Sequence, residues 1–213
     1  MRRNPRVGLA RWSALAVLLA LGFAASGCGA LKRCAYSGLG RDDWQQPEKV
    51  MAALAVEPGD HVADLGAGGG YFTFRLAEAV GPEGRVYAID VDPDMTGHLR
   101  ERAEDEGTPQ VVVIDAAPDD PRIPEGGADL VLVTNTYHHL EDRVAYFARL
   151  RERLRAGGRV AIIEPTGEGG GFPAGHATGP DAIRDELAEA GYRLDERHAF
   201  LERQSFQIFS AEP

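Results

Sequence analysis

Short apolar segments alternate with amphipathic helical patterns along most of this 213-residue chain, and no other feature constrains its fold as strongly. Strands that alternate with helices form a parallel sheet, because each helix carries the chain back across the sheet. The segment Val131-Leu132-Val133 has no polar position, which is typical of a strand covered by helices on both faces. The predicted strands cover residues 61–65, 85–89, 110–114, 129–133 and 159–164. The predicted helices cover residues 47–57, 71–80, 94–106, 141–154 and 181–190.

Two further strands are predicted at the end of the chain, over residues 192–199 and 205–209. They follow each other too closely for a helical crossover, so we expect them to pair antiparallel. The pattern shows no repeat and no second core. We therefore expect one α/β domain over residues 47–213.

The first residues have a different composition from this core. Four arginines without an acidic residue precede an apolar run from Trp12 to Ala25, which is too short to span a bilayer comfortably as a helix. This run closes on Ala25-Ser26-Gly27-Cys28, which resembles a bacterial lipobox. The resemblance implies a signal peptide over residues 1–27, lipidation of Cys28, and a tether over residues 28–46.

The expected protein is therefore exported and held at a membrane of the bacterial cell envelope by acyl chains. Two alternatives stay open. The leader is an ordinary signal peptide with Cys28 as a bystander, or it is retained as an anchor that faces the cytosol.

Charge and cysteine content exclude several classes of protein. Asp and Glu number 33 against 23 Lys and Arg, a net charge of −10, which argues against a nucleic-acid partner. Cys28 and Cys34 are the two cysteines, too few for a disulfide framework or a four-cysteine zinc site.

A glycine-rich loop follows the first predicted strand, in the order Asp64-Leu-Gly66-Ala-Gly68-Gly-Gly70. Glycine lets the backbone turn sharply and approach a ligand closely. The dinucleotide pattern G-x-G-x-x-G is not met, because Tyr71 stands where the third glycine belongs. A nicotinamide cofactor is therefore not expected.

Acidic residues end the next two strands. Asp90 stands twenty residues after Gly70, where a carboxylate can accept hydrogen bonds from a ribose diol. The alternative role of an acid at this junction is to cap the next helix, which Asp92 can do instead. Asp115 can accept from an adenine amino group while the Ala116 N–H faces a ring nitrogen; its alternative is a solvated loop acid.

In this order, these motifs resemble the class I S-adenosylmethionine-dependent methyltransferases over residues 47–210. Residues 128–133 are similar to the family's fourth motif, and residues 154–160 to its L-x-P-G-G-x-hydrophobic segment, with Ala156 in place of Pro. The resemblance implies a Rossmann-like, seven-stranded, mostly parallel sheet with an antiparallel C-terminal hairpin and helices on both faces. It also implies S-adenosyl-L-methionine as cofactor, bound by Asp64, Gly66, Gly68, Gly70, Asp90, Asp115, Ala116 and Asn135.

The segment after the fourth strand holds the candidate catalytic residues, His138 and His139. Either can act as a base or contact the methyl acceptor. In the alternative interpretation, one caps the following helix and the other packs beneath it. A metal is not expected, because adjacent histidines rarely converge and no third ligand stands at a metal-binding spacing. Glu164 and His176 are weaker candidates.

These features predict a methyltransferase that acts on a small molecule or lipid. The sulfonium donor already activates its methyl group, so the protein mainly aligns the acceptor and excludes water. Arsenite-type enzymes are disfavoured, because they use several cysteines and none follows Cys34. The alternative is a catalytically silent donor-binding or scaffold lipoprotein, because the donor is made in the cytosol and the leader predicts export.

Overall fold

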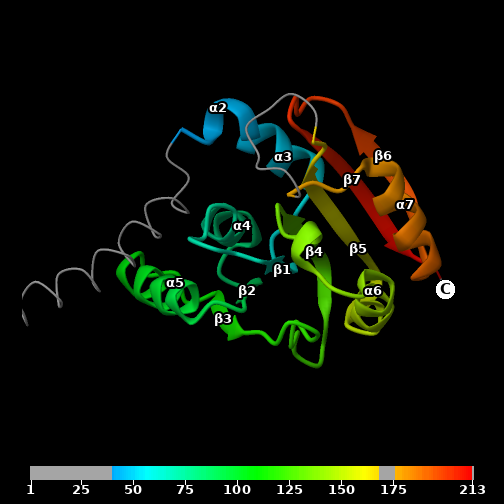
Figure 1. Ribbon diagram of the computed structural model, residues 1–213. Coiled ribbons are helices and arrows are strands. Elements are labelled where there is room, and N and C mark those ends of the chain that lie inside the picture. The colour runs from blue at the N-terminus through cyan, green and yellow to red at the C-terminus, as the bar shows by residue number, and fades with distance from the viewer. Residues whose placement is uncertain (1–39, 168–175, 213) are drawn as a thin grey trace, which may run out of the picture.

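The computed structural model describes residues 40–167 and 176–212, and a seven-stranded sheet runs through them in the order β3-β2-β1-β4-β5-β7-β6 (Figure 1). The strands are β1 (His61–Leu65), β2 (Arg85–Asp90), β3 (Val111–Asp115), β4 (Ala128–Thr134), β5 (Leu154–Pro165), β6 (Tyr192–His198) and β7 (Gln204–Ala211). Strands β1 to β5 pair parallel, and β7 pairs antiparallel with both β5 and β6. The expected fold class is confirmed.

Helices cover both faces of the sheet (Figure 1). The helices are α2 (Asp42–Gln45), α3 (Pro47–Leu54), α4 (Thr73–Val80), α5 (Pro93–Asp105), α6 (Arg143–Arg151), α7 (Pro180–Glu189) and the 3₁₀ turn η1 (Tyr137–His139). One face packs on apolar side chains of α3, α4 and α5, and the other on those of η1, α6 and α7. Each buried strand therefore contributes to two cores, which explains its continuous apolar sequence.

Local sequence marks the start of three helices, α3, α5 and α7. Pro47, Pro93 and Pro180 stand in first turns, where the missing N–H has no intrahelical partner to lose. The side chain of Asp92 accepts a hydrogen bond from the Asp94 N–H at 3.0 Å and caps α5.

The expected helix over residues 141–154 is too long. Helix α6 ends at Arg151, and β5 already begins at Leu154. Leu154 pairs with Ala128, and a register shift separates this contact from the main β4–β5 ladder. Pairing with a distant strand thus overrides the helical pattern of the sequence.

Residues 41–46, assigned to the tether from the sequence, contact the domain through several side chains. Asp42 accepts a hydrogen bond from the Tyr71 hydroxyl at 2.7 Å and forms an ion pair with Arg75 at 3.2 Å. Gln45 is fully buried and donates to the side chain of Gln204 at 2.9 Å. Polar and charged residues dominate this stretch and give no local signal of packing, whereas its contacts are with residues far along the chain.

None of the helices within residues 40–167 and 176–212 has the length and apolar character needed to cross a membrane. The predicted signal peptide, the lipidation site Cys28 and the apolar run over residues 12–25 lie outside the described residues.

Gly70 provides a test of the packing between the glycine loop and the helices. Its φ is +83°, and an added Cβ would meet side-chain atoms of Phe74 at 2.6 Å and Leu99 at 2.9 Å. We expect Gly70→Ala to lower the free energy of unfolding by about 2 kcal/mol or more, through overpacking and backbone strain.

Gly97 is the matched control, because it lies within α5 and has open space around its Cβ position. Gly97→Ala is expected to raise the free energy of unfolding by up to about 1 kcal/mol. Urea unfolding followed by circular dichroism measures both variants. Equal effects of the two substitutions would contradict this account of Gly70.

Candidate functional site

A cavity of about 520 Å³ opens at the carboxyl ends of β1, β2 and β4. The connection after β1 leads to α4 on one face of the sheet, and the connection after β4 leads to η1 and α6 on the other face. The two loops therefore diverge and leave a crevice between them. Its lining comes from the loops after these strands and from residues next to α2. The volume lies in the range of small-molecule sites.

The glycine loop is held against the end of β2. The N–H groups of Gly66 and Ala67 both donate to the carbonyl of Ile89, at 2.8 and 3.0 Å. A Cβ on Gly66 would lie 2.1 Å from Thr136 Oγ1, so glycine is required where the two loops meet. Gly66 and Gly68 line the cavity, whereas the lining does not include Gly70, which packs against α4 and α5 instead.

Asp64 lies at the buried end of the cavity wall. Its side chain is 3% exposed and accepts a hydrogen bond from Thr73 Oγ1 at 2.6 Å. Burial raises its pKa to about 6, although the Thr73 hydroxyl and the charge of Arg41 act in the opposite direction. The cavity thus contains a carboxylate whose negative charge is only partly compensated.

Asp90 organises the loops on both sides of it. One carboxylate oxygen accepts from the Gly68 N–H at 2.8 Å, and the other from the Asp92 N–H at 2.9 Å. Asp90 also lines the cavity. It therefore fixes the glycine loop and presents a carboxylate to the same space.

The two groups expected to contact adenine, the Asp115 side chain and the Ala116 N–H, both have partners within the chain. The Asp115 side chain is exposed and paired with Arg100 at 2.7 Å, which keeps its pKa below the usual range, and it is not part of the cavity lining. Ala116 does line the cavity, but its N–H donates to the Asp90 carbonyl at 2.9 Å. That N–H is not available to a ring nitrogen, because the β2–β3 pairing uses it.

Asn135 lines the cavity in a left-handed conformation, with φ +55°. Its side-chain carbonyl accepts from Gln204, whose own carbonyl accepts from Gln45. This chain of amides joins the end of β4 to β7 and α2. The sequence carries no local signal for the roles of Gln45 and Gln204.

Arg41 and Trp44 form part of the cavity wall next to α2, and sequence reasoning missed both. The Arg41 guanidinium carbon lies 4.2 Å from the centre of the Tyr71 ring, a cation–π contact. Burial lowers the pKa of Arg41. The sequence signal that could have indicated this packing was Trp44, a large aromatic residue within a polar stretch.

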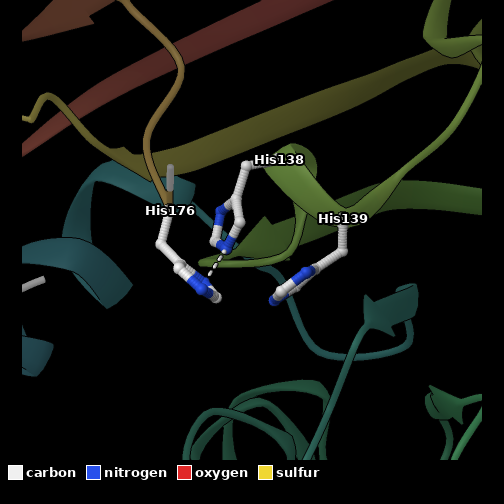
Figure 2. Close-up of side chains that lie close together, drawn as sticks. All are labelled: His138, His139 and His176. Atoms are coloured by element: carbon white, nitrogen blue, oxygen red, sulfur yellow. Dashed lines mark hydrogen bonds between the residues drawn. The ribbon is translucent and has the colours of Figure 1, made fainter. Parts of the chain in front are cut away.

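The rings of the two adjacent histidines of η1 lie close together, with their centroids 4.0 Å apart (Figure 2). His138 Nδ1 lies 2.5 Å from a carboxylate oxygen of Glu164, which is fully buried on β5, while His139 lines the cavity. Burial raises the pKa of Glu164 to about 8. Burial, together with the neighbouring histidines His139 and His176, lowers the pKa of His138 to about 4.

His176 approaches the same two residues from the segment before α7 (Figure 2). Its Nδ1 lies 3.1 Å from His138 Nε2, and one nitrogen of each histidine falls within 4.8 Å of the others. The sequence offers no third ligand at a metal-binding spacing, but the fold brings His176, which stands 37 and 38 positions from the other two, next to them.

Residues 62–158 match the family model described as a methyltransferase domain. Among characterised proteins, the chain is similar to the aklanonic acid methyltransferase DauC of Streptomyces sp. (strain C5). The two are 34% identical over 115 residues, covering 54% of this chain and 52% of that protein. An arsenite methyltransferase of Halobacterium salinarum is 28% identical over 165 residues, covering 78% of this chain and 41% of that protein. The chain thus spans about half, or less, of the length of these relatives.

The fold also resembles solved structures. A SAM-dependent methyltransferase from Aquifex aeolicus superposes with a TM-score of 0.77 at 23% identity, covering 84% of this chain and 98% of that one. At this level of identity the likeness concerns the fold.

The buried carboxylate of Asp64 predicts a specific pH dependence of stability. A folded-state pKa of about 6 against 3.8 corresponds to roughly 3 kcal/mol. The sign follows from proton binding: between pH 4 and 6 the native state holds more protons than the unfolded state, so stability falls as pH rises. Asp64→Asn removes this titration, and the variant should gain roughly 2–3 kcal/mol relative to the parent between pH 4 and pH 7.

Urea unfolding of both proteins at several pH values measures this difference. Asp115→Asn serves as the control, because that acid is exposed and its difference from the parent should change little. A constant difference between Asp64→Asn and the parent across this range would refute the assignment.

Proposed function

We propose that this chain is an S-adenosylmethionine-dependent methyltransferase whose donor occupies the cavity at the ends of β1, β2 and β4. The methyltransferase-domain match, the methyltransferase relatives and the fold neighbour support both the enzyme class and the cofactor. The observation that carries the proposal is the convergence of Asp64, the glycine loop and Asp90 on one cavity.

Each part of this cavity suits one part of the donor. The buried carboxylate of Asp64 complements the ammonium group of the methionine portion, which would compensate its charge. The carboxylate of Asp90 suits the ribose hydroxyls. Val91, Met95 and Pro118 line the cavity and offer apolar contacts for a flat ring, in place of the polar contacts expected from Asp115 and the Ala116 N–H.

The donor, when bound, supplies a methyl group on a positively charged sulfur that leaves in an in-line displacement. The chain's own residues orient the two reactants and keep water out. Arg41, Trp44 and Tyr71 wall the cavity on the side of α2, and Asn135 is held by Gln204 at the end of β4.

A small-molecule acceptor fits these observations better than a nucleic acid. The chain carries a net charge of −10, and its relative DauC is named for aklanonic acid, a small molecule. A lipid acceptor is compatible with the proposed membrane location.

His139 is our candidate base or acceptor contact, because it lines the cavity, while His138 faces Glu164.

The chain has no cysteine after Cys34, which argues against arsenite as the acceptor despite the similarity to an arsenite methyltransferase.

The second candidate function is a protein that binds the donor without catalysing methyl transfer, or that serves as a scaffold. It is favoured by the proposed export signal over residues 1–27, because the donor is made in the cytosol.

We also propose that the chain is exported and lipidated at Cys28, on the evidence of the lipobox-like Ala25-Ser26-Gly27-Cys28. Mass spectrometry of the native N-terminus tests this. An acylated Cys28 at the first position supports it, and an unmodified Met1 rejects it.

Donor binding provides a quantitative test of the cavity. Asp90→Ala removes the ribose contact and releases two loop N–H groups, so affinity for both S-adenosylmethionine and its demethylated product should fall roughly 10- to 100-fold. Asp115→Ala should change affinity by less than about threefold, because its side chain lies outside the cavity lining. Titration calorimetry on the full chain measures both variants, and equal losses would contradict the proposed donor position.

Transfer of a labelled methyl group into separated lipid, small-molecule and protein fractions distinguishes the two functions. Label in one fraction, lost with Asp90→Ala, supports an enzyme. Donor binding without transfer to any fraction supports the silent protein.

A further inference from the structure

We propose that His138, His139 and His176 form a binding site for a divalent transition-metal ion of the Zn²⁺ type at the edge of the cavity. One ring nitrogen of each residue lies within 4.8 Å of the other two. Two of the histidines come from η1 after β4, and the third from the segment before α7 (Figure 2). The site does not depend on methyl transfer, so it stands or falls separately from the proposed enzyme activity.

The spacing of two of these nitrogens already suits a metal ion. His138 Nε2 lies 3.1 Å from His176 Nδ1. Two imidazole nitrogens bound to tetrahedral Zn²⁺ at about 2.0–2.1 Å are roughly 3.3–3.4 Å apart. One edge of the coordination tetrahedron is thus nearly formed, and the third nitrogen needs to move by no more than about 1.5 Å. His139 is exposed, so a small change of its side-chain torsions can provide this movement.

Glu164 orients the central ligand. Its carboxylate lies 2.5 Å from His138 Nδ1. A cation bound at His138 Nε2 would favour the ionised Glu164, which then accepts the Nδ1 proton and leaves the Nε2 lone pair for the metal. That lone pair faces His176 (Figure 2). A carboxylate that holds the far nitrogen of a histidine is the usual outer partner of a metal-binding histidine.

The burial of Glu164 is only partly compensated: the backbone N–H groups of His138 and Tyr137 and the charge of Arg143 favour the ionised carboxylate, but burial outweighs them. Its residue is fully buried, and its second oxygen, Oε2, has no hydrogen-bond partner within the described part of the chain. The charge of a buried carboxylate is costly unless hydrogen bonds or a close cation offset it in full. A divalent ion beyond His138 would offset that cost through the imidazole ring.

The ligand set selects the class of ion. Three imidazole nitrogens suit Zn²⁺, Co²⁺, Ni²⁺ or Cu²⁺, whereas Mg²⁺ and Ca²⁺ prefer oxygen ligands. Binding would replace the contact between His138 and His176 by two nitrogen–metal bonds, and the shared proton would pass to His176 Nε2. Three protein ligands leave one coordination position for water or another small ligand. Because His139 lines the cavity, this ion would border the space proposed for the reaction.

Titration calorimetry of the metal-stripped full chain with ZnCl₂ tests the site. Cysteine thiolates also bind Zn²⁺, so the parent and every variant in this experiment carry Cys28→Ser and Cys34→Ser. We expect one Zn²⁺ per chain, and at least about tenfold weaker binding in His176→Ala and in His139→Ala. Glu164→Gln should weaken binding by about 10- to 100-fold, because it removes the orienting carboxylate.

His98→Ala is the matched control, because His98 lies on α5 outside the cluster and should leave Zn²⁺ binding unchanged. Co²⁺ adds a spectroscopic readout: a tetrahedral nitrogen-rich site gives intense visible absorption, which should be lost in His176→Ala and kept in His98→Ala. Circular dichroism confirms that each variant is folded.

Absence of Zn²⁺ binding in the parent would overturn the proposal. So would equal binding by His176→Ala and His98→Ala, or Mg²⁺ binding as tight as that of Zn²⁺. Donor binding that persists in a parent without Zn²⁺ binding would reject the metal site and leave the proposed function intact.

Discussion

The parallel pairing of β1 with β2 on one side and β4 on the other is the constraint on which the rest of this structure depends. The ladders place Leu65 beside both Ile89 and Val133, so three strands end at one level of the sheet. Their loops must diverge, because the connections after β1 and β4 lie on opposite faces. The cavity is a consequence of this topology, and the polar residues at its rim come from all three loops.

Two buried carboxylates, Asp64 and Glu164, stand near these strand ends, and the fold compensates each in a different way. Asp64 has the Thr73 hydroxyl and the charge of Arg41 beside it, and it lines the cavity. Glu164 has a histidine, and one of its oxygens has no hydrogen-bond partner in the described chain. Both groups have raised pKa values because burial disfavours their charge, so each favours a cation nearby. This shared property underlies the proposed roles of Asp64 toward the donor and of Glu164 toward a metal.

Sequence patterns predicted the fold well because its signals are local. Apolar runs, first-turn prolines and the cap of Asp92 act over a few residues, and the predicted strands and helices overlap those of the structure. Prediction failed where distant pairing decides. Leu154 joins a strand because Ala128 lies beside it, and α2 belongs to the domain because Gln45 meets Gln204.

For the site, the sequence by itself determined the glycine loop, Asp64 and Asp90, since residues at strand ends of a parallel sheet must meet at one edge. Only the tertiary structure decided which of these groups face the cavity. It turned Asp115 toward Arg100, engaged the Ala116 N–H in the sheet, and brought His176 to His138. The physical reason is that spacing along a chain specifies the position of a backbone segment in a regular fold. The direction of a side chain and its partners depend on neighbours that are distant in sequence.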